Sequence, residues 1–228
     1  MNEQNWQVLV VSYENQASLA YALKGVDVVL STISGDAQLA LIEAAATAQV
    51  HLFIPSAFSG PEQCSTQATG EGDWDDLISL LNHHETTSSL RYSLFTCGAF
   101  YERFGPGGLN ALEVSTADNR HSSIGDEGNL LVDLRAGRAT IPIKPGNDEL
   151  ALCMTSTRDV ARYVVATIQA YEDLTTWPRE FKFCTERLTM SQLVNTCSRI
   201  RGTYSFPSWR TGVEGRQCSF QVGLSPVS

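Results

Sequence analysis

The chain has 228 residues, 43% of them hydrophobic and 18% charged, a composition typical of a soluble globular protein and too apolar for a disordered one. Its net charge of −9 disfavours nucleic-acid binding, which needs a basic face. No apolar run reaches the roughly 18 residues that a transmembrane helix needs, and residues 1–7 do not resemble a signal peptide. The six cysteines include no Cys-x-x-Cys motif and no histidine at ligand spacing, so we expect no metal site and a cytoplasmic protein with reduced thiols.

Apolar runs alternate with helical patterns from residue 8 to residue 97. We predict strands at residues 8–12, 27–33, 50–56 and 91–97. Helices are predicted at residues 16–24, with Asn15 as N-cap and Gly25 at the C-terminal end, at residues 38–49, and around Trp74, Leu77, Ile78 and Leu81. The strand at 27–33 is continuously apolar, which is typical of a sheet that is covered on both faces. This order predicts an α/β fold with a parallel sheet and right-handed crossovers.

The order loosens after Gly98. Residues 105–108 predict a turn, and residues 130–143 predict short strand pieces on either side of residues 135–137. Two helices then return, at residues 159–171 after Ser156 and at residues 191–201 after Thr189, whose spacing to Gln192 is that of a capping box. From residue 202 to residue 228 the sequence is a polar tail without a clear period.

Small and hydroxyl-bearing residues follow three of the predicted strands, at residues 31–35, 55–60 and 96–101. In open parallel sheets, ligands bind outside the carboxyl ends of the strands, so these segments are candidates for a binding crevice. Small residues also end strands for purely structural reasons, and the sequence leaves both interpretations open.

Several segments together resemble one family. The stretches VDVVLSTISG, VHLFIPSAF, RYSLFTCGAFYERFGPGGL and CMTSTRDVARYVVATI are similar to the NmrA-like branch of the atypical short-chain dehydrogenases, the relatives of isoflavone reductase, and especially to its fungal members. The resemblance extends from residue 6 to residue 201. It implies a Rossmann-like sheet that binds NADP(H) in residues 1–104 and a smaller substrate lobe in residues 105–201.

By this resemblance, the cofactor-binding residues are Thr32, Ile33, Pro55, Ser56 and Phe58. The implied substrate-binding residues are Cys97, Gly98, Phe100 and Tyr101. One polar contact of the family site is missing, because Ala57 stands where the family has a glutamate.

Two further features depart from the family. The family begins with a strand, a glycine-rich turn and a helix that hold the pyrophosphate, and no such unit occurs in this sequence. In the strand order 3-2-1-4-5-6, the absent strands would separate residues 8–12 from residues 27–33. We therefore expect an N-terminally truncated Rossmann-like sheet whose unpaired edge favours oligomers or a protein partner.

The second departure concerns catalysis, because the family's reductases use a lysine that this chain lacks between residues 60 and 91. His83, His84, Tyr92 and Tyr101 are possible substitutes, but a solvated helix terminus explains the two histidines better, and a tyrosine such as Tyr101 is more often a packed aromatic ring. The catalytic residue is therefore unknown from the sequence.

Three functions are compatible with these features. The resemblance implies an NAD(P)H-dependent oxidoreductase that reduces a small aromatic or unsaturated metabolite, in a setting of fungal secondary metabolism. The two departures favour a non-catalytic, NmrA-like regulator that binds a transcription factor or another protein, in the cytoplasm or the nucleus. A truncated product without activity is the third alternative.

Overall fold

The computed structural model describes residues 7–58, 73–112, 132–134, 138–141, 151–170, 173–200, 208–212 and 215–219. These residues form two compact units. Of the described residues, unit 1 contains 7–58, 73–95 and 173–181, and unit 2 contains the others.

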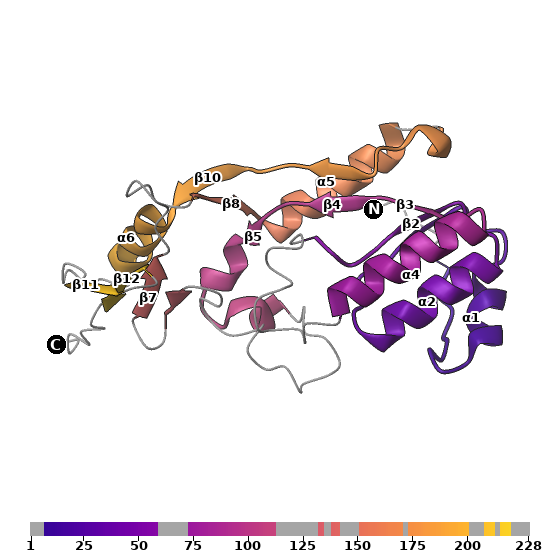
Figure 1. The fold of residues 1–228 in the computed structure, drawn as a ribbon, viewed down its shortest axis with the longest axis horizontal. Coiled ribbons are helices and arrows are strands. Elements are labelled where there is room, and N and C mark those ends of the chain that lie inside the picture. Colours follow the sequence, from indigo (N-terminus) through magenta and orange to yellow (C-terminus); the bar gives the residue numbers. More distant parts are fainter. Residues whose placement is uncertain are drawn as a thin grey trace. The chain divides into compact units, whose positions relative to one another are not determined.

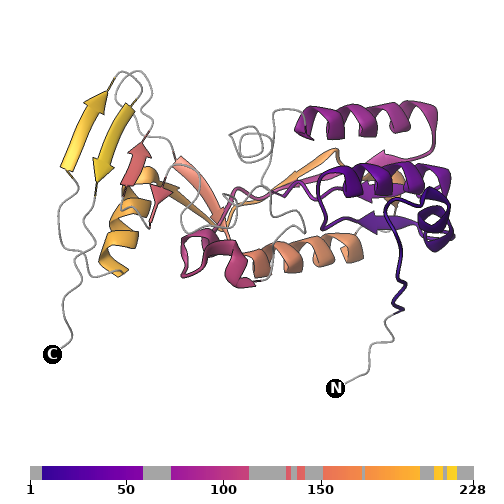
Figure 2. The same cartoon turned by 90° about the horizontal axis from the view of Figure 1, so that it is seen from below.

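Unit 1 is built on a three-stranded parallel sheet. Its strands are β1 (Val28–Leu30), β2 (Leu52–Ile54) and β3 (Arg91–Tyr92), in the order β1-β2-β3. Helix α2 (Asp36–Thr47) connects β1 to β2, and helix α4 (Asp73–Thr87) precedes β3. The two helices lie side by side on one face of the sheet (Figures 1 and 2). The predicted alternation of parallel strands and helices is therefore confirmed from β1 to β3.

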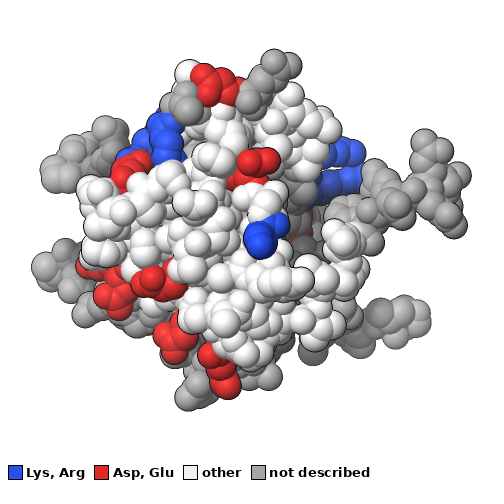
Figure 3. Space-filling model, turned by 90° about the vertical axis from the view of Figure 1, so that its right-hand side faces the viewer, with Lys and Arg blue, Asp and Glu red and all other residues white. Residues whose placement is uncertain are grey.

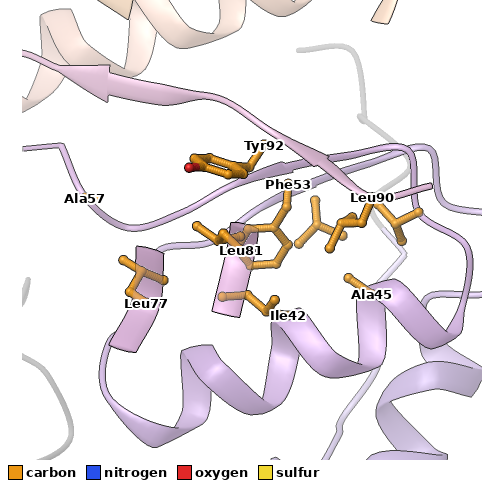
Figure 4. Packing of buried hydrophobic residues seen from close by; sticks show 10 residues of the cluster. Ile42, Ala45, Phe53, Ala57, Leu77, Leu81, Leu90 and Tyr92 are labelled. Atoms are coloured by element: carbon orange, nitrogen blue, oxygen red, sulfur yellow. The ribbon is translucent and has the colours of Figure 1, made fainter. Parts of the chain in front are cut away.

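The core of unit 1 lies between this sheet and its two helices. All three residues of β2 are buried, and the Phe53 ring extends toward Ile42 of α2 and Leu81 of α4 (Figure 4). These three side chains are at most 1% exposed. Full burial of each such side chain stabilises the fold by about 1.5–3 kcal/mol.

Helix α1 (Gln16–Ala22) packs against α2 and begins as the sequence predicted. The Ser18 N–H donates a hydrogen bond to the Asn15 side chain at 3.0 Å, which satisfies one of the free amides of the first turn. Gly25 follows the helix with φ of 79°, a left-handed conformation that glycine adopts without strain.

The predicted strand at residues 8–12 was wrong. These residues form no strand, and Val8 and Val10 are 83% and 98% exposed. A strand needs a neighbour to pair its N–H and C=O groups, and β1 is the end strand of its sheet among the described residues. The apolar residues of this segment therefore predict a buried strand, but the segment is exposed and forms no strand.

The predicted strand at residues 91–97 is divided into β3 and β4 (Leu94–Thr96). The Ser93 N–H donates to the Phe53 carbonyl of β2 at 3.1 Å, but the next N–H, that of Leu94, donates to the Arg179 carbonyl at 2.9 Å. The chain thus leaves β2 at Ser93, and β4 pairs with β9 (Glu180–Lys182). The Ser93 hydroxyl stabilises this change by donating to the Pro178 carbonyl at 2.7 Å.

Unit 2 contains a mixed sheet in the order β10-β8-β5. Strand β8 (Ala151–Thr155) lies parallel to β5 (Ala99–Phe100) and antiparallel to β10 (Glu186–Thr189). Two short 3-10 helices, Tyr101–Phe104 and Gly108–Leu112, follow β5 on either side of the predicted turn.

Unit 2 also contains two α-helices, and both of their predicted caps are confirmed. Helix α5 (Thr157–Ala170) begins where the Asp159 N–H donates to the Ser156 hydroxyl at 3.0 Å. Helix α6 (Met190–Ile200) has a reciprocal capping box, because the Gln192 N–H donates to the Thr189 hydroxyl at 3.2 Å and the Thr189 N–H donates to the Gln192 side chain at 2.8 Å. The buried core of unit 2 includes Met154 of β8 and Val194 of α6.

A second sheet of unit 2 has four antiparallel strands in the order β11-β12-β7-β6. Strands β6 (Val132–Asp133) and β7 (Arg138–Ile141) are the strand pieces that the sequence predicted. The hairpin of β11 (Ser208–Gly212) and β12 (Gly215–Ser219) was missed, because its polar sequence has no apolar period and its pairing comes from the backbone.

The fold class is therefore α/β with a Rossmann-like parallel sheet, as the sequence predicted. On the side of the molecule seen in Figure 3, acidic side chains lie in several separate places and outnumber the basic ones, in agreement with the net charge of −9. Among the residues that the structure describes, no helix is long and apolar enough to cross a membrane.

The C-terminal end of α2 gives a prediction about stability. Gln49 has φ of 62°, and the bonds from the Gln49 N–H to the Ala46 carbonyl and from the Val50 N–H to the Ala45 carbonyl form a Schellman motif. A left-handed conformation strains any residue with a Cβ atom. We expect Gln49→Gly to raise the free energy of unfolding by about 0.5–1 kcal/mol in urea denaturation.

The control is Gly25→Ala, which places a Cβ atom at another left-handed position with open space around it. We expect this change to destabilise the protein by about 1 kcal/mol. Equal unfolding midpoints for Gln49→Gly and the unchanged protein would contradict the left-handed assignment.

Candidate functional site

The structure places the predicted cofactor-binding residues at the carboxyl ends of two neighbouring strands. Thr32 and Ile33 follow β1, and Pro55, Ser56 and Phe58 follow β2. Because the strands are parallel, with Leu30 opposite Ile54, both ends lie at the same edge of the sheet. A bond from the Ser31 N–H to the Ile54 carbonyl, 2.8 Å long, holds the two ends together.

The segment after β1 turns away from the sheet in a defined conformation. The buried Ser31 hydroxyl donates to the Ile33 carbonyl at 3.3 Å and accepts from the Ile33 N–H at 3.4 Å. Gly35 then starts α2 with φ of 66°, and a Cβ atom there would meet nothing within 4 Å. Thr32 is exposed and Ile33 half-buried as a result.

Gln38 of α2 connects this helix to the end of β2. Its side-chain oxygen accepts a hydrogen bond from the Ser56 N–H at 2.6 Å, and the residue is only 4% exposed. The bond fixes the backbone on which Pro55 and Ser56 stand. Sequence analysis did not single out Gln38, since a glutamine in the first turn of a helix is usually a surface residue and nothing in a single sequence marks it otherwise.

This edge of unit 1 fits the ring-bearing parts of a dinucleotide better than its phosphates. It offers an exposed Thr32, a hydroxyl at Ser56 and half-buried side chains at Ile33 and Phe58. No lysine or arginine occurs between Lys24 and Arg91, and the first turn of α2 carries the acidic Asp36. Phosphate groups are held by cations or by free helix N-termini, and an acidic first turn opposes them.

The predicted substrate-binding residues lie in unit 2, around the start of β5. Cys97 is fully buried, and burial raises the pKa of its thiol to about 12. A Cβ atom on Gly98, which has φ of 72°, would lie 2.3 Å from the Cys153 carbonyl oxygen. The glycine therefore lets β8 approach closely, which explains this residue without a ligand.

Tyr101 stands at the start of a 3-10 helix with its hydroxyl bound to β10. The hydroxyl donates to the Glu186 carboxylate at 2.6 Å. Burial and this hydrogen bond raise the pKa of Tyr101 well above its usual value, so the phenol keeps its proton across the neutral range. Such a group orients or binds a substrate better than it donates a proton, because an efficient general acid has a pKa near the working pH. Phe100, beside it, is half-buried.

The other possible substitutes for the absent lysine have structural partners. His84 of α4 lies 3.0 Å from the Glu43 carboxylate of α2, and the Tyr92 hydroxyl donates to the Asn82 side chain at 2.8 Å. His83 lies beside His84 in an edge-to-face ring contact. The catalytic residue thus stays unassigned.

A surface hollow of about 400 Å³ lies at the opposite end of the unit 1 sheet, before the strands begin. Its lining includes Lys24, Asp27 and His51, with Asp27 and His51 3.4 Å apart. None of the predicted site residues lines it. In the part of the chain that the structure describes, no group of His, Cys, Asp and Glu is placed to hold a metal ion.

The bond between Gln38 and Ser56 gives a second prediction. Gln38→Leu removes the acceptor and leaves a partly buried N–H without it, so we expect a loss of about 1–3 kcal/mol in the free energy of unfolding. Gln16→Leu is the matched control, because the Gln16 side chain donates to the Ala40 carbonyl at an exposed position, where we expect a change within about 0.5 kcal/mol. Equal losses in urea denaturation would contradict a special role for Gln38.

The raised pKa of Cys97 gives a third prediction. A thiol that stays protonated and buried reacts slowly with alkylating reagents, because the thiolate is the nucleophile. In the folded protein at pH about 8, below the pKa of about 12, we expect iodoacetamide to modify the exposed Cys184 and to leave Cys97 unmodified, as peptide mass spectrometry would show. Equal labelling of the two thiols would contradict the burial of Cys97.

The fold is shared with several solved structures. A nucleoside-diphosphate-sugar epimerase from Staphylococcus aureus superposes with a TM-score of 0.51 and 18% identity over 84% of this chain. AtPrR2, solved with NADP+ and (+)pinoresinol, gives 0.53 and 20% over 84%, and Pen from Bacillus thuringiensis gives 0.51 and 10% over 86%. The chain covers only 60%, 58% and 59% of these three proteins.

No match to a curated protein was found. The sequence profile of the NmrA-like family, in contrast, matches residues 1–204, nearly the whole chain. With the parallel sheet of unit 1 and its paired strand ends, this match shows that the chain belongs to the NmrA-like family.

Proposed function

We propose that this chain is an NAD(P)H-dependent oxidoreductase of the NmrA-like family. The observation that carries the proposal is the arrangement of the two strand ends in unit 1, where Ser31 and Gln38 hold the predicted cofactor-binding residues at one edge of a parallel sheet. Family membership supports it, and the related AtPrR2 was solved with NADP+.

The residues of unit 1 have separate tasks in this proposal. Thr32 and Ile33 would line the adenine-ribose side, and Pro55, Ser56 and Phe58 would lie beside the nicotinamide. The bound cofactor would supply a hydride. The buried Gln38 keeps the backbone at Ser56 in place, and Ser56 offers a hydroxyl to a polar group of the ring.

The substrate in this proposal is a small aromatic or unsaturated metabolite, in a setting of fungal secondary metabolism, and residues 105–201 form the substrate lobe. Phe100 and Tyr101 supply aromatic surface of the kind that such a molecule contacts. The bond to Glu186 uses the proton of the Tyr101 hydroxyl, which leaves the phenol oxygen to accept a hydrogen bond from a substrate.

A second candidate function is a regulator that binds a protein partner and performs no catalysis. Two observations favour it. No lysine or arginine between Lys24 and Arg91 can neutralise the phosphates of a dinucleotide. Among the described residues, β1 has a strand on one side only, so its other edge can accept a strand from a partner.

NADPH titration separates the two candidates. We expect the purified chain to bind NADPH, measured by calorimetry and nicotinamide fluorescence. Ser56→Trp should weaken binding by at least about tenfold, because the indole fills the space beside the strand end. Ser89→Trp is the matched control, since this exposed serine lies at the opposite end of the sheet, where we expect unchanged affinity.

The outcomes differ clearly. No binding at millimolar NADPH would contradict the oxidoreductase and favour the regulator. Binding that is weakened by Ser89→Trp and unaffected by Ser56→Trp would contradict the placement of the cofactor at the carboxyl ends of β1 and β2.

A further inference from the structure

The lysine and arginine residues of unit 1 are not placed at the carboxyl ends of β1 and β2. Unit 1 contains three of them, Lys24, Arg91 and Arg179. Lys24 lines the hollow at the opposite end of the sheet. Arg91 is paired with Leu52, the first residue of β2, and its guanidinium donates to the Leu174 carbonyl at 3.1 Å.

Arg179 is bound to two side chains near the start of β3. Its guanidinium forms an ion pair with the carboxylate of Glu85, in the last turn of α4. The same group lies 3.9 Å from the centre of the Tyr92 ring, in a cation–π contact. Both arginines of unit 1 therefore have protein partners, and these contacts would be lost if either side chain moved to a phosphate group.

The charge that follows β1 is negative instead. Asp36 is the first residue of α2 and comes three positions after Ile33, one of the residues proposed to line the adenine-ribose side. Three steps of 3.8 Å separate their Cα atoms by at most about 11 Å. Asp36 is exposed and takes part in none of the ion pairs between described residues. Its negative charge is thus retained at the edge that the adenine ribose would occupy.

This charge bears on the one difference between the two nicotinamide cofactors. NADPH carries a phosphate group on the 2′ oxygen of the adenine ribose, with a charge of about −1.5 to −2 at neutral pH, whereas NADH carries a hydroxyl group there. Phosphate groups are bound by arginine and lysine, and a like charge beside them costs free energy. A hydroxyl group, in contrast, can donate a hydrogen bond to a carboxylate. In dinucleotide-binding folds in general, an acidic residue at this ribose fits NAD and an arginine fits NADP.

We propose that Asp36 is a specificity-determining residue that makes the site select NADH over NADPH. This selectivity rests on the proposed function, because it requires a nicotinamide cofactor at the carboxyl ends of β1 and β2. The Asp36 carboxylate repels the 2′-phosphate of NADPH, and no lysine or arginine of unit 1 offsets the repulsion. The neutral 2′-hydroxyl of NADH is not repelled.

The test compares the two cofactors on the same protein. The full chain is titrated with NADH and with NADPH at low ionic strength, and binding is followed by nicotinamide fluorescence and calorimetry. We expect NADH to bind at least about tenfold more tightly than NADPH. This ratio should decrease in about 0.5 M sodium chloride, because salt screens the repulsion between separated charges.

Three variants assign the selectivity to one side chain. Asp36→Asn removes the charge and keeps a hydrogen-bond acceptor, so we expect NADPH to bind at least about threefold more tightly and NADH to change by less than about twofold. Asp36→Arg supplies a cation and should reverse the preference. Asp27→Asn is the matched control, because this exposed aspartate lies at the opposite end of the sheet and undergoes the same change of charge. The ratio of the two affinities should be unchanged in this control, and circular dichroism checks that all three variants are folded.

The possible outcomes separate this selectivity from the proposed function. If NADPH binds the unchanged protein as tightly as NADH does, the selectivity is overturned and the oxidoreductase is not. If the preference for NADH persists in Asp36→Asn and Asp36→Arg, or is lost in Asp27→Asn, the role of Asp36 is overturned. If neither cofactor binds at millimolar concentration, the proposed function fails and the selectivity fails with it.

Discussion

The fold of unit 1 depends on the burial of its central strand. Each residue of β2 is at most 1% exposed, so the strand needs β1 and β3 on its two sides and the helices α2 and α4 over its Phe53 face. A buried strand cannot leave its N–H and C=O groups unpaired, and β2 pairs with β1 in a parallel register. This register brings the segments after β1 and β2 to one edge, where the proposed cofactor-binding residues lie.

At the same edge, the chain has the fold of its family but only part of the chemistry that a dinucleotide site needs. The strand ends have the small residues, the hydroxyls and the buried glutamine bond that hold a backbone open to a ligand. Charge is missing, because no lysine or arginine occurs between Lys24 and Arg91 and Asp36 starts α2. The NmrA-like fold is therefore established, while the proposed activity depends on how a dinucleotide's phosphates would be accommodated. The proposed oxidoreductase must accommodate these phosphates, whereas a regulator that binds only a protein partner need not.

The wrong predictions from the sequence have a common cause, because each concerns which strands pair with each other. Residues 8–12 have the apolar composition of a buried strand but no neighbouring strand, and they are exposed. Residues 91–97 have the pattern of one strand, yet the chain changes neighbours at Ser93 because Arg179 and Pro178 offer carbonyls there. The β11–β12 hairpin forms from polar residues through backbone pairing alone. Strand pairing is a long-range property, so local pattern does not determine it.

The sequence by itself determined the features that depend on local chemistry and periodicity. It predicted the helices, the caps at Asn15, Ser156 and Thr189, the parallel β1 and β2, and the family, because caps and periods are set by residues a few positions apart. Only the tertiary structure decided that Gln38 holds the end of β2 and that Gly98 makes room for β8. Gln38 and Ser56 are 18 positions apart in the sequence, and Gly98 and Cys153 are 55 positions apart. Close packing between such distant residues has no signature in any one segment of the sequence.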